Sequence, residues 1–390
     1  MIWLTQIRMI KFYLRKEMFM ESIFSKKENC CGCSACYNTC PKQAISMKED
    51  EEGFLYPVID QSLCVDCGKC TKVCPLIQSG NYKHNSIPEF FVAKHKSEEV
   101  LMKSTSGGAF TAISDEILRL GGVVYGADYD HEFRVMHKRA ENEEQRNRMR
   151  VSKYVQSNLG DVFKQIKTDL TNGKIVLFTG TPCQIAGLRG FIGDSPLVKN
   201  LYLCDLICYG IPSPLIWDDY KNILEKEYGG KLVDVKFRSK IAGWSRKKSN
   251  ESFLFKTSNS ENFHHDGRFY QLFFGKKTII RPSCGKCLYT DIHRSSDITI
   301  ADYWGIEKYA PEWMDAKGVS LIITNTSKGE ELLMKCSTTL KYEKRAKEES
   351  LEEQQRLSGP IEFPKDRKEF WEEYQKFGLA HLLDQLPEEF

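Results

Sequence analysis

Cysteine is the residue type whose spacing could support chemistry in this chain. Of its 15 cysteines, nine fall between Cys30 and Cys74. Eight of these nine form two copies of the spacing Cys-x2-Cys-x2-Cys-x3-Cys-Pro, and the second copy begins 34 residues after the first. Thiolates three residues apart, on a loop that wraps back on itself, can reach three irons of one iron–sulfur cube. The pattern therefore predicts two 4Fe-4S clusters.

The fourth ligand of each cube must come from outside its run of three thiolates. In the bacterial ferredoxin pattern, which this spacing resembles, the Cys before Pro binds the other cluster. Zinc is the competing interpretation, but four-thiolate zinc sites usually come as separated Cys-x2-Cys pairs. Cys31 falls outside the register, and we treat it as a spare thiol. The predicted ligand sets are Cys30, Cys33, Cys36 and Cys74 for one cluster and Cys64, Cys67, Cys70 and Cys40 for the other.

The segments between and after the cysteine repeats define the first domain. Apolar residues at 44–47 and 54–59 flank an acidic turn at 48–53, which predicts a short hairpin covering the clusters. A polar stretch at 78–86 is typical of a linker. Residues 25–80 are therefore expected to form an α+β ferredoxin-like dicluster domain.

Several global features of the sequence limit which class of protein this can be, namely its length, its composition and its first residues. A chain of 390 residues is too long for one core and indicates two or three domains. Its 56 Lys and Arg against 53 Asp and Glu give a net charge of +3, which is no nucleic-acid signature. Residues 1–24, an N-terminal extension with Met20 as an alternative start, contain neither an apolar run long enough for a membrane span nor a signal-peptide cleavage site. A short amphipathic helix is the alternative there. We therefore expect a cytoplasmic protein whose thiols bind metal or lie buried.

The rest of the chain alternates strand-like and helix-like segments. Strands are predicted at 90–93, 123–127, 173–178, 201–208, 297–301 and 319–324, with helices at 109–120, 184–191 and 215–228. This alternation predicts an α/β domain after residue 88. The Ser/Gly turn at 104–108 before a helix would suit a phosphate, although an ordinary helix cap looks the same.

Four further cysteines lie where ligands collect in open α/β folds. Cys183 and Cys208 follow predicted strands, and Cys284 and Cys287 form a knuckle that can present two thiolates to one metal. Buried cysteines without chemistry are the alternative. Cys204 is interpreted as packing, and His264 and His265 as part of an exposed loop rather than a metal site.

Several ordered motifs together resemble a known family. They are Ser-x-Ser-Gly-Gly-Ala-Phe at 104–110, Ser-Lys-Tyr-Val-Gln-Ser at 152–157, Gly-Thr-Pro-Cys-Gln at 180–184, the segment 205–214 around Cys208, Arg-Pro-Ser-Cys-x-x-Cys at 281–287 and the segment 296–305 containing Asp302 and Trp304. The chain resembles, from about Cys30 to Lys335, the coenzyme F420 hydrogenase/dehydrogenase beta subunit family in its bacterial form with an N-terminal dicluster ferredoxin domain.

The resemblance implies an iron–sulfur flavoprotein. Its body, residues 88–340, would be an α/β flavin-binding domain that holds FAD and a third 4Fe-4S cluster, the latter on Cys183, Cys208, Cys284 and Cys287. Residues 341–390, with 22 charges in 50 residues, are expected to form a solvated helical tail. Its apolar residues could alternatively dock on the body or on a partner: Tyr374, Phe377, Leu379, Leu382 and Leu383. The candidate flavin contacts are Ser106, Gly107, Gly108, Lys153, Tyr154, Gln156 and Ser157, with the amides of the Gly-rich turn facing the pyrophosphate.

The function implied is electron transfer coupled to hydride chemistry. Electrons from a redox partner protein, of ferredoxin or dehydrogenase type, would pass through the clusters to FAD and on to a small-molecule hydride acceptor, or in the reverse direction. Two alternatives remain: an electron-transfer subunit without a substrate site of its own, and a structural iron–sulfur protein. The beta subunits that give the family its name reduce a deazaflavin, and use of that coenzyme stays open here. By analogy with bacterial relatives, some of which accompany surface-polysaccharide genes, a sugar derivative or another small organic molecule is the other candidate substrate.

Overall fold

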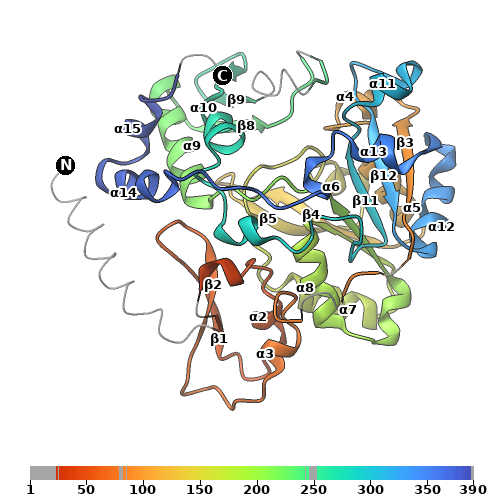
Figure 1. Ribbon diagram of the computed structural model, residues 1–390, viewed down its shortest axis with the longest axis horizontal. Coiled ribbons are helices and arrows are strands. Elements are labelled where there is room, and N and C mark those ends of the chain that lie inside the picture. Colours follow the sequence, from red (N-terminus) through yellow and green to blue (C-terminus); the bar gives the residue numbers. More distant parts are fainter. Residues whose placement is uncertain are drawn as a thin grey trace.

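A computed structural model describes residues 23–24, 26–78, 82–84, 86–241, 243–245 and 253–387 of the chain. The expectations for residues 1–22 lie outside the described residues. A small N-terminal lobe, residues 26–78, lies against one end of a larger body (Figure 1). The two parts match the predicted order of a ferredoxin-like domain followed by a mixed α/β domain.

The N-terminal lobe contains the predicted hairpin. Strands β1 (Ile45–Glu49) and β2 (Leu55–Ile59) pair antiparallel, with Ile45 opposite Ile59. The Asp50 carboxylate closes the turn by accepting hydrogen bonds from the amides of Glu52 and Phe54. Two short helices, α2 (Ala35–Thr39) and α3 (Lys69–Lys72), each contain the third cysteine of a repeat.

An eight-stranded mixed sheet forms the centre of the body, in the order β13-β3-β12-β11-β7-β6-β4-β5. The four central strands, β11, β7, β6 and β4, run parallel, and the strands on both sides of them are antiparallel. Parallel neighbours need crossover connections, which the intervening helices supply. The strands are β3 (Glu89–His95), β4 (Val123–Tyr129), β5 (Val135–Ala140), β6 (Val176–Gly180), β7 (Leu201–Leu206), β11 (Ile298–Asp302), β12 (Ser320–Thr324) and β13 (Leu340–Arg345).

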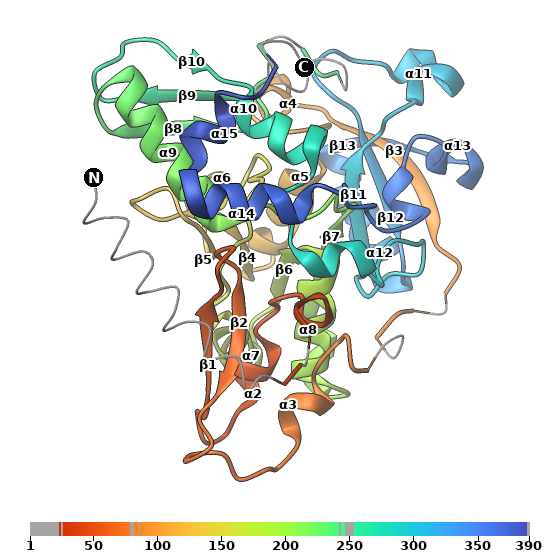
Figure 2. The same cartoon turned by 60° about the vertical axis from the view of Figure 1, so that its left-hand side comes forward.

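Helices cover both faces of this sheet. Consecutive strand residues point to opposite faces, and Val123 and Val124 accordingly belong to different cores. Helices α5 (Ala109–Arg119) and α12 (Ser327–Lys335) pack on one face, and α7 (Val162–Thr171) and α8 (Pro182–Ile192) pack on the other. The lobe helix α2 contacts α7 and α8, so the lobe lies against this second layer (Figure 2).

A second, three-stranded sheet joins the body beside the main one. It consists of β8 (Leu232–Lys236), β9 (Leu254–Thr257) and β10 (His264–His265), and it shares an aromatic core with α9 (Pro214–Tyr228). The loop prediction at His264 and His265 is wrong, because both residues pair with β9 and the His264 ring lies 4.6 Å from that of Tyr228; His265 is nevertheless exposed, as predicted.

The prediction of a solvated helical tail at 341–390 is wrong, whereas the alternative, docking of its apolar residues on the body, is confirmed for Tyr374, Leu379, Leu382 and Leu383. The segment begins inside β13, an edge strand that pairs with β3, and its helices α14 (Arg367–Phe377) and α15 (Leu379–Leu383) pack into the aromatic core. Phe370, Trp371 and Tyr374 are buried on one face of α14. The charged side chains occupy the opposite, solvated face, which is why composition alone suggested a free tail.

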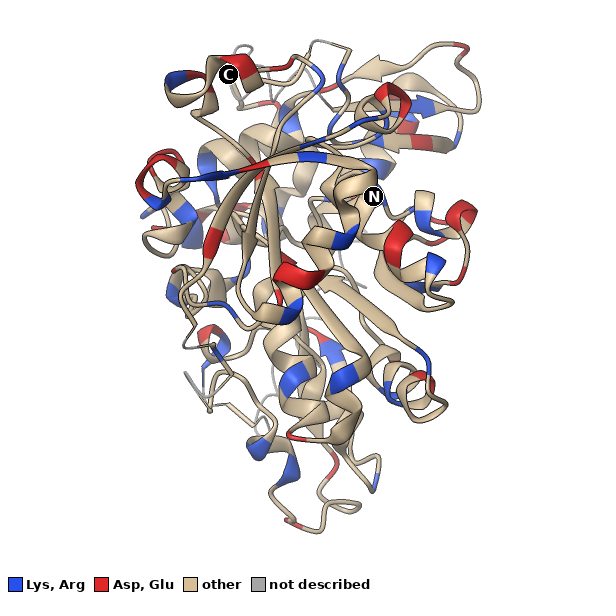
Figure 3. Cartoon of the chain, turned by 90° about the vertical axis from the view of Figure 1, so that its right-hand side faces the viewer, with Lys and Arg blue, Asp and Glu red and all other residues tan. Residues whose placement is uncertain are grey.

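The remaining helical segments are short, and charge is distributed over the surface. Lys and Arg segments alternate with Asp and Glu segments over the face seen in Figure 3. Among the described helices none is both long and apolar enough to cross a bilayer. The short helices are α4 (Glu98–Met102), α6 (Glu143–Asn147), α10 (Arg268–Tyr270), α11 (Ile306–Tyr309) and α13 (Lys347–Leu351), with single 3-10 or π turns at Lys27–Asn29, Pro196–Asn200, Gln271–Lys276, Pro282–Lys286, Pro311–Trp313, Cys336–Thr338 and Gln355–Leu357.

Candidate functional site

The two cysteine repeats share one backbone conformation. Gly32 and Ser34 have φ of 70° and 58°, and the residues 34 positions later, Asp66 and Gly68, have φ of 49° and 67°. Each left-handed residue turns the chain sharply, so the loop curls and the cysteines on either side of it point inward. The two copies of the cysteine spacing therefore also share the same pair of left-handed backbone turns.

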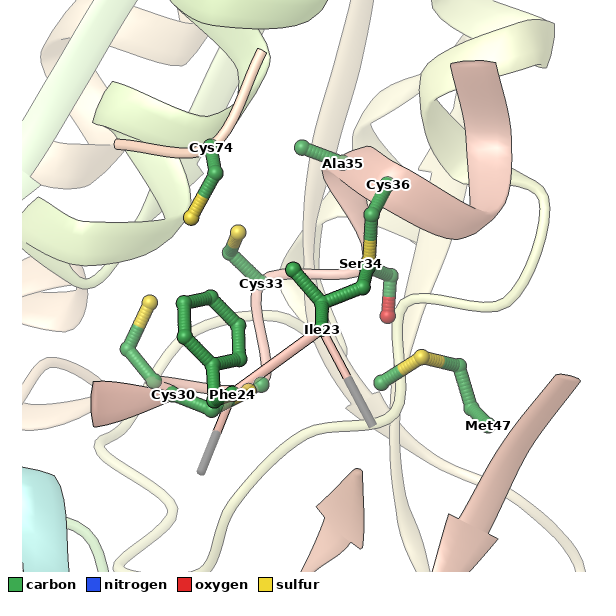
Figure 4. A pocket seen from close by; sticks show the side chains of 11 residues that line it. Ile23, Phe24, Cys30, Cys33, Ser34, Ala35, Cys36, Met47 and Cys74 are labelled. Carbon is green, nitrogen blue, oxygen red and sulfur yellow. The ribbon is translucent and has the colours of Figure 1, made fainter. Parts of the chain in front are cut away.

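Four thiols of the lobe surround one pocket. We call Cys30, Cys33, Cys36 and Cys74 the inner thiols; all four line one small pocket. Figure 4 shows the sulfurs of Cys30, Cys33 and Cys74 near this space, with Phe24 beside them. Burial raises the pKa of the Cys36 thiol, and the nearby Cys30 and Cys74 raise it further. A cationic iron core reverses this preference, because coordinated thiols lose their protons.

The other four lobe cysteines, the outer thiols, lie closer to solvent. Cys64, Cys67 and Cys70 form a group in which burial raises the pKa of Cys70 and its two neighbours add to the shift. Cys67 is exposed. The sulfur of Cys40, the predicted fourth member, accepts a hydrogen bond from the Ala44 amide at 3.3 Å. Among the described residues no three His, Cys, Asp or Glu side chains converge closely enough to hold a single metal ion.

The body brings together the four cysteines that the resemblance selected. We call Cys183, Cys208, Cys284 and Cys287 the body thiols. Burial raises the pKa of Cys208 to about 12, and neighbouring Cys183 and Cys287 contribute to that shift. Burial likewise raises the pKa of Cys287 to about 11, with Cys183 adding to it. Three widely separated segments, the start of α8, the loop after β7 and the turn Pro282–Lys286 with the residue that follows it, therefore bring four partly buried cysteines together.

Cys31 connects the inner thiols to the body thiols. Cys31 and Cys33 lie in the same buried core, and Cys183 packs against that core. The residue is buried in the core shared by the lobe and the α7–α8 layer. Sequence spacing made it a spare thiol, because its partner Cys183 lies on a different domain.

A large cavity adjoins the body thiols. It has a volume of about 570 Å³, within the range of small-molecule and cofactor sites, and Cys208 is one of its lining residues. Its wall contains five of the seven predicted flavin contacts: Ser106, Gly108, Lys153, Tyr154 and Ser157. We call it the central cavity.

Gly107 and Gln156 are placed elsewhere. The Gly107 amide donates to the Ser320 hydroxyl at 2.9 Å, and a Cβ there would lie 2.5 Å from the Ala93 carbonyl oxygen. The expectation that this amide faces a pyrophosphate is therefore wrong, because a tight backbone contact already uses it. Gln156 instead reaches the lobe and donates to the Cys31 carbonyl at 3.2 Å.

Cationic side chains line the central cavity. Lys153 donates to the carbonyls of Arg148, Arg150 and Val151, and burial lowers its pKa to about 8. Buried guanidinium nitrogens of Arg150 and Arg356, which also line the cavity, have no hydrogen-bond partner among the described residues. This distribution suits a ligand that carries negative charge.

A cluster of aromatic and charged side chains forms another part of the cavity wall. The Asp302 carboxylate accepts from the Trp244 indole at 2.6 Å and from Arg238 at 3.3 Å. Arg238 also donates to the Tyr154 hydroxyl at 3.1 Å, and the rings of Trp244 and Trp304 stack 4.6 Å apart. Asp302 and Trp304 belong to a motif of the sequence, whereas nothing in the sequence pattern indicated Arg238 or Trp244.

The C-terminal segment completes the cavity. Residues 353–356 line it, and Gln354 donates to the Asp302 carbonyl at 2.8 Å. The guanidinium of Arg356 lies 5.6 Å from the ring of Tyr209, which is the residue after Cys208. Sequence analysis missed these residues because it assigned the segment to a free tail.

Comparison with known proteins agrees with this division of the chain. Residues 29–76 match the 4Fe-4S dicluster domain, and residues 173–350 match the family described as the C terminus of the coenzyme F420 hydrogenase/dehydrogenase beta subunit. Over these residues the chain resembles this beta subunit family. The matches indicate an iron–sulfur protein related to oxidoreductases.

Individual relatives are more distant. Coenzyme F420-dependent sulfite reductase of Methanocaldococcus jannaschii is 26% identical over 323 residues, which cover 78% of this chain and 45% of that protein. The chain thus spans about half the length of this relative. An uncharacterized ferredoxin of the same organism is 38% identical over 53 residues, covering 14% of this chain and 68% of the ferredoxin. A chain of the F420-reducing [NiFe] hydrogenase complex from Methanosarcina barkeri is similar with a TM-score of 0.47 and 16% identity, covering 77% of this chain and 96% of that one.

Proposed function

We propose that this chain is an iron–sulfur flavoprotein oxidoreductase that exchanges electrons between a redox partner protein and a small-molecule hydride acceptor or donor. The observation that carries the proposal is the contiguity of its parts. Cys31 and the inner thiol Cys33 lie in one buried core against which the body thiol Cys183 packs, and the body thiol Cys208 lines the central cavity. Cysteine side chains thus lead from the lobe to a cavity of cofactor size.

Three 4Fe-4S clusters are proposed, one on each set of thiols. The inner thiols fit a cluster because four sulfurs surround one pocket, and the body thiols fit because four partly buried cysteines from three segments meet. Bound clusters would carry single electrons, and bound FAD would combine two of them for hydride transfer. The protein contributes placement, a buried environment for the inner set, and an exposed outer thiol, Cys67, where a partner can approach.

FAD is proposed to occupy the central cavity. Ser106, Gly108, Lys153, Tyr154 and Ser157 remain the candidate contacts, because all of them line it. Arg150 and Arg356 are added, since their unpartnered nitrogens would satisfy phosphate oxygens. Gly107 and Gln156 are left out of the flavin site for the reasons given above.

The hydride partner is proposed to be a small organic molecule. The F420 named in the family and in the sulfite reductase relative makes this deazaflavin one candidate to test, and a sugar derivative is the other. Fifteen free cysteines suit a reducing compartment, and we place the protein in the cytoplasm.

An electron-transfer subunit without its own substrate is the second candidate. It is favoured by exposed apolar side chains beside the outer thiols, namely Leu63 and Val65, which are 49% and 56% exposed. Such a patch suits a protein partner at the outer cluster.

An acceptor assay separates these two candidates. The protein is purified anaerobically, reduced with dithionite, freed of excess reductant by gel filtration and mixed with F420 or with nucleotide sugars. Oxidation of the protein with matching acceptor reduction supports the enzyme. Stoichiometric copurification with a second polypeptide, together with no reduction of any soluble acceptor by the isolated chain, supports the subunit and overturns the enzyme.

A further inference from the structure

Arg281 is a buried cation whose described polar contacts include no carboxylate. The side chain is 1% exposed. Its Nε donates to the Cys30 carbonyl at 2.9 Å, one Nη donates to Gln156 Oε1 at 2.8 Å, and the other donates to the Leu55 carbonyl at 3.0 Å. That last nitrogen also lies 3.8 Å from the Cys30 sulfur. Within the described part of the chain no Asp or Glu forms an ion pair with this guanidinium.

Two other arginines are buried to the same degree, and both are paired. Arg146 contacts the Asp115 carboxylate at 2.5 Å, and Arg294 contacts the Asp205 carboxylate at 3.0 Å. A buried charge without an opposite charge costs several kcal/mol, roughly, in folding free energy. Of the three fully buried guanidinium groups in the described part of the chain, two are therefore compensated by carboxylates and the third faces sulfur.

The surroundings fix the orientation of Arg281. Its guanidinium lies 4.3 Å from the centre of the Tyr56 ring and 5.2 Å from that of Phe54, both in the lobe. Gln156 accepts from it while donating to the Cys31 carbonyl, so the amide is locked by both hydrogen bonds. A side chain held in this way cannot turn away to find another anion.

We infer that Arg281 is the counter-ion of the iron–sulfur cluster on the inner thiols. This inference rests on the proposed assignment of a cluster to those thiols. Four thiolates give such a cluster a net negative charge, which increases by one when the cluster accepts an electron. A fixed cation beside Cys30 stabilises the reduced form more than the oxidised form and so raises the reduction potential. Gln156 acts as a positioning residue for this charge rather than as a flavin ligand.

The same side chain ties the lobe to the body. Arg281 comes three residues before the body thiol Cys284, while three of its four hydrogen-bonding contacts are lobe atoms. Because the attraction grows with the charge of the cluster, reduction strengthens the contact between lobe and body. Arg281 is therefore expected to change the reduction potential of the inner cluster most, that of the body cluster less, and that of the outer cluster least.

The test is an anaerobic redox titration followed by electron paramagnetic resonance, with Arg281→Gln, Arg281→Lys and wild-type protein. The inner cluster is identified as the signal that Cys36→Ala removes. Arg281→Gln is expected to shift the midpoint potential of this signal to a more negative value. Arg281→Lys, which keeps the charge, is expected to stay nearer to wild type. If Arg281→Gln fails to fold, Gln156→Leu still decides, because it removes the amide that orients the guanidinium and must shift the inner signal more than the other two.

Arg146→Gln is the matched control, since it removes an equally buried arginine that is paired with Asp115. It is expected to lower stability and leave all potentials unchanged. Unchanged potentials in every Arg281 and Gln156 variant, or equal shifts of all clusters, would overturn the counter-ion assignment. Absence of the inner signal from wild-type protein would instead overturn the proposed cluster itself, so the two failures are distinguishable.

Discussion

At the scale of single residues, the cysteines were predictable and their counter-ion was not. A fixed spacing reveals the inner thiols because ligands on one loop must lie at set intervals. Arg281 and Cys31 have no such signal, since their partners lie 251 and 152 residues away in the sequence. Gln156 was selected within a motif, but its position against the lobe became visible only in three dimensions.

Removing one body thiol tests the third cluster. Cys284→Ser is expected to lower the iron content of anaerobically purified protein from about twelve to about eight per chain, because its ligand set shares no residue with the lobe clusters. Cys336→Ser, at a buried cysteine in a core away from the thiol sets, is the control and should keep its iron. An iron content in Cys284→Ser equal to that of wild type would rule out the assignment.

His137, which lines the central cavity, gives a pH dependence with a defined sign. Burial lowers its pKa from 6.5 to about 4, while its Nε2 donates to the Thr179 carbonyl at 2.9 Å. Between those pH values the unfolded chain binds more protons, so stability falls as the pH falls from 6.5 towards 4. Within this window, lowering the pH by one unit reduces the free energy of unfolding by up to about 1.4 kcal/mol through this one group.

The measurement is anaerobic urea unfolding at pH 7 and pH 5.5 for wild type and His137→Gln. The variant is expected to lose less stability on acidification. His131→Gln, at a side chain that is 83% exposed, is the control and should follow the wild type. Equal acid sensitivity of His137→Gln and wild type would show that His137 does not titrate in this way.

At the scale of elements, local signals predicted the helices and strands that carry a clear period. Helix α5 was expected at 109–120 and spans Ala109–Arg119, and α9 was expected at 215–228 and spans Pro214–Tyr228. Strand β13 was missed because an edge strand exposes alternate charged residues, here Lys341 and Glu343, and so looks like part of a polar tail.

Helix α8 joins the lobe to the body, and Gly187 permits the contact. A Cβ at this position would lie 2.8 Å from both the Cβ and the sulfur of Cys33. Gly187→Ala is therefore expected to displace an inner thiol, to cost about 1–3 kcal/mol of stability, and to reduce the inner cluster signal. Gly359→Ala, where a Cβ meets no atom within 4 Å, is the matched control. Full retention of the inner signal in Gly187→Ala would show that the lobe does not depend on this close approach.

At the scale of the whole molecule, the fold places three thiol sets in series and ends them at one cavity. Domain order and the mixed α/β class followed from the sequence, because repeated cysteine spacing and alternating strands and helices are local patterns. The closure of the cavity could not be predicted from the sequence. Residues 353–356 reach the cavity only after the chain has formed β13 at the far edge of the sheet. The central claim is that a flavin occupies this cavity beside a third cluster.

Iron, sulfide and flavin quantitation on anaerobically purified protein, followed by an optical titration with dithionite, tests that claim most directly. The account predicts about twelve irons and twelve sulfides per chain, from three clusters of four, and about one flavin that dithionite reduces. About eight irons and no flavin would contradict it and leave only the two clusters of the N-terminal lobe.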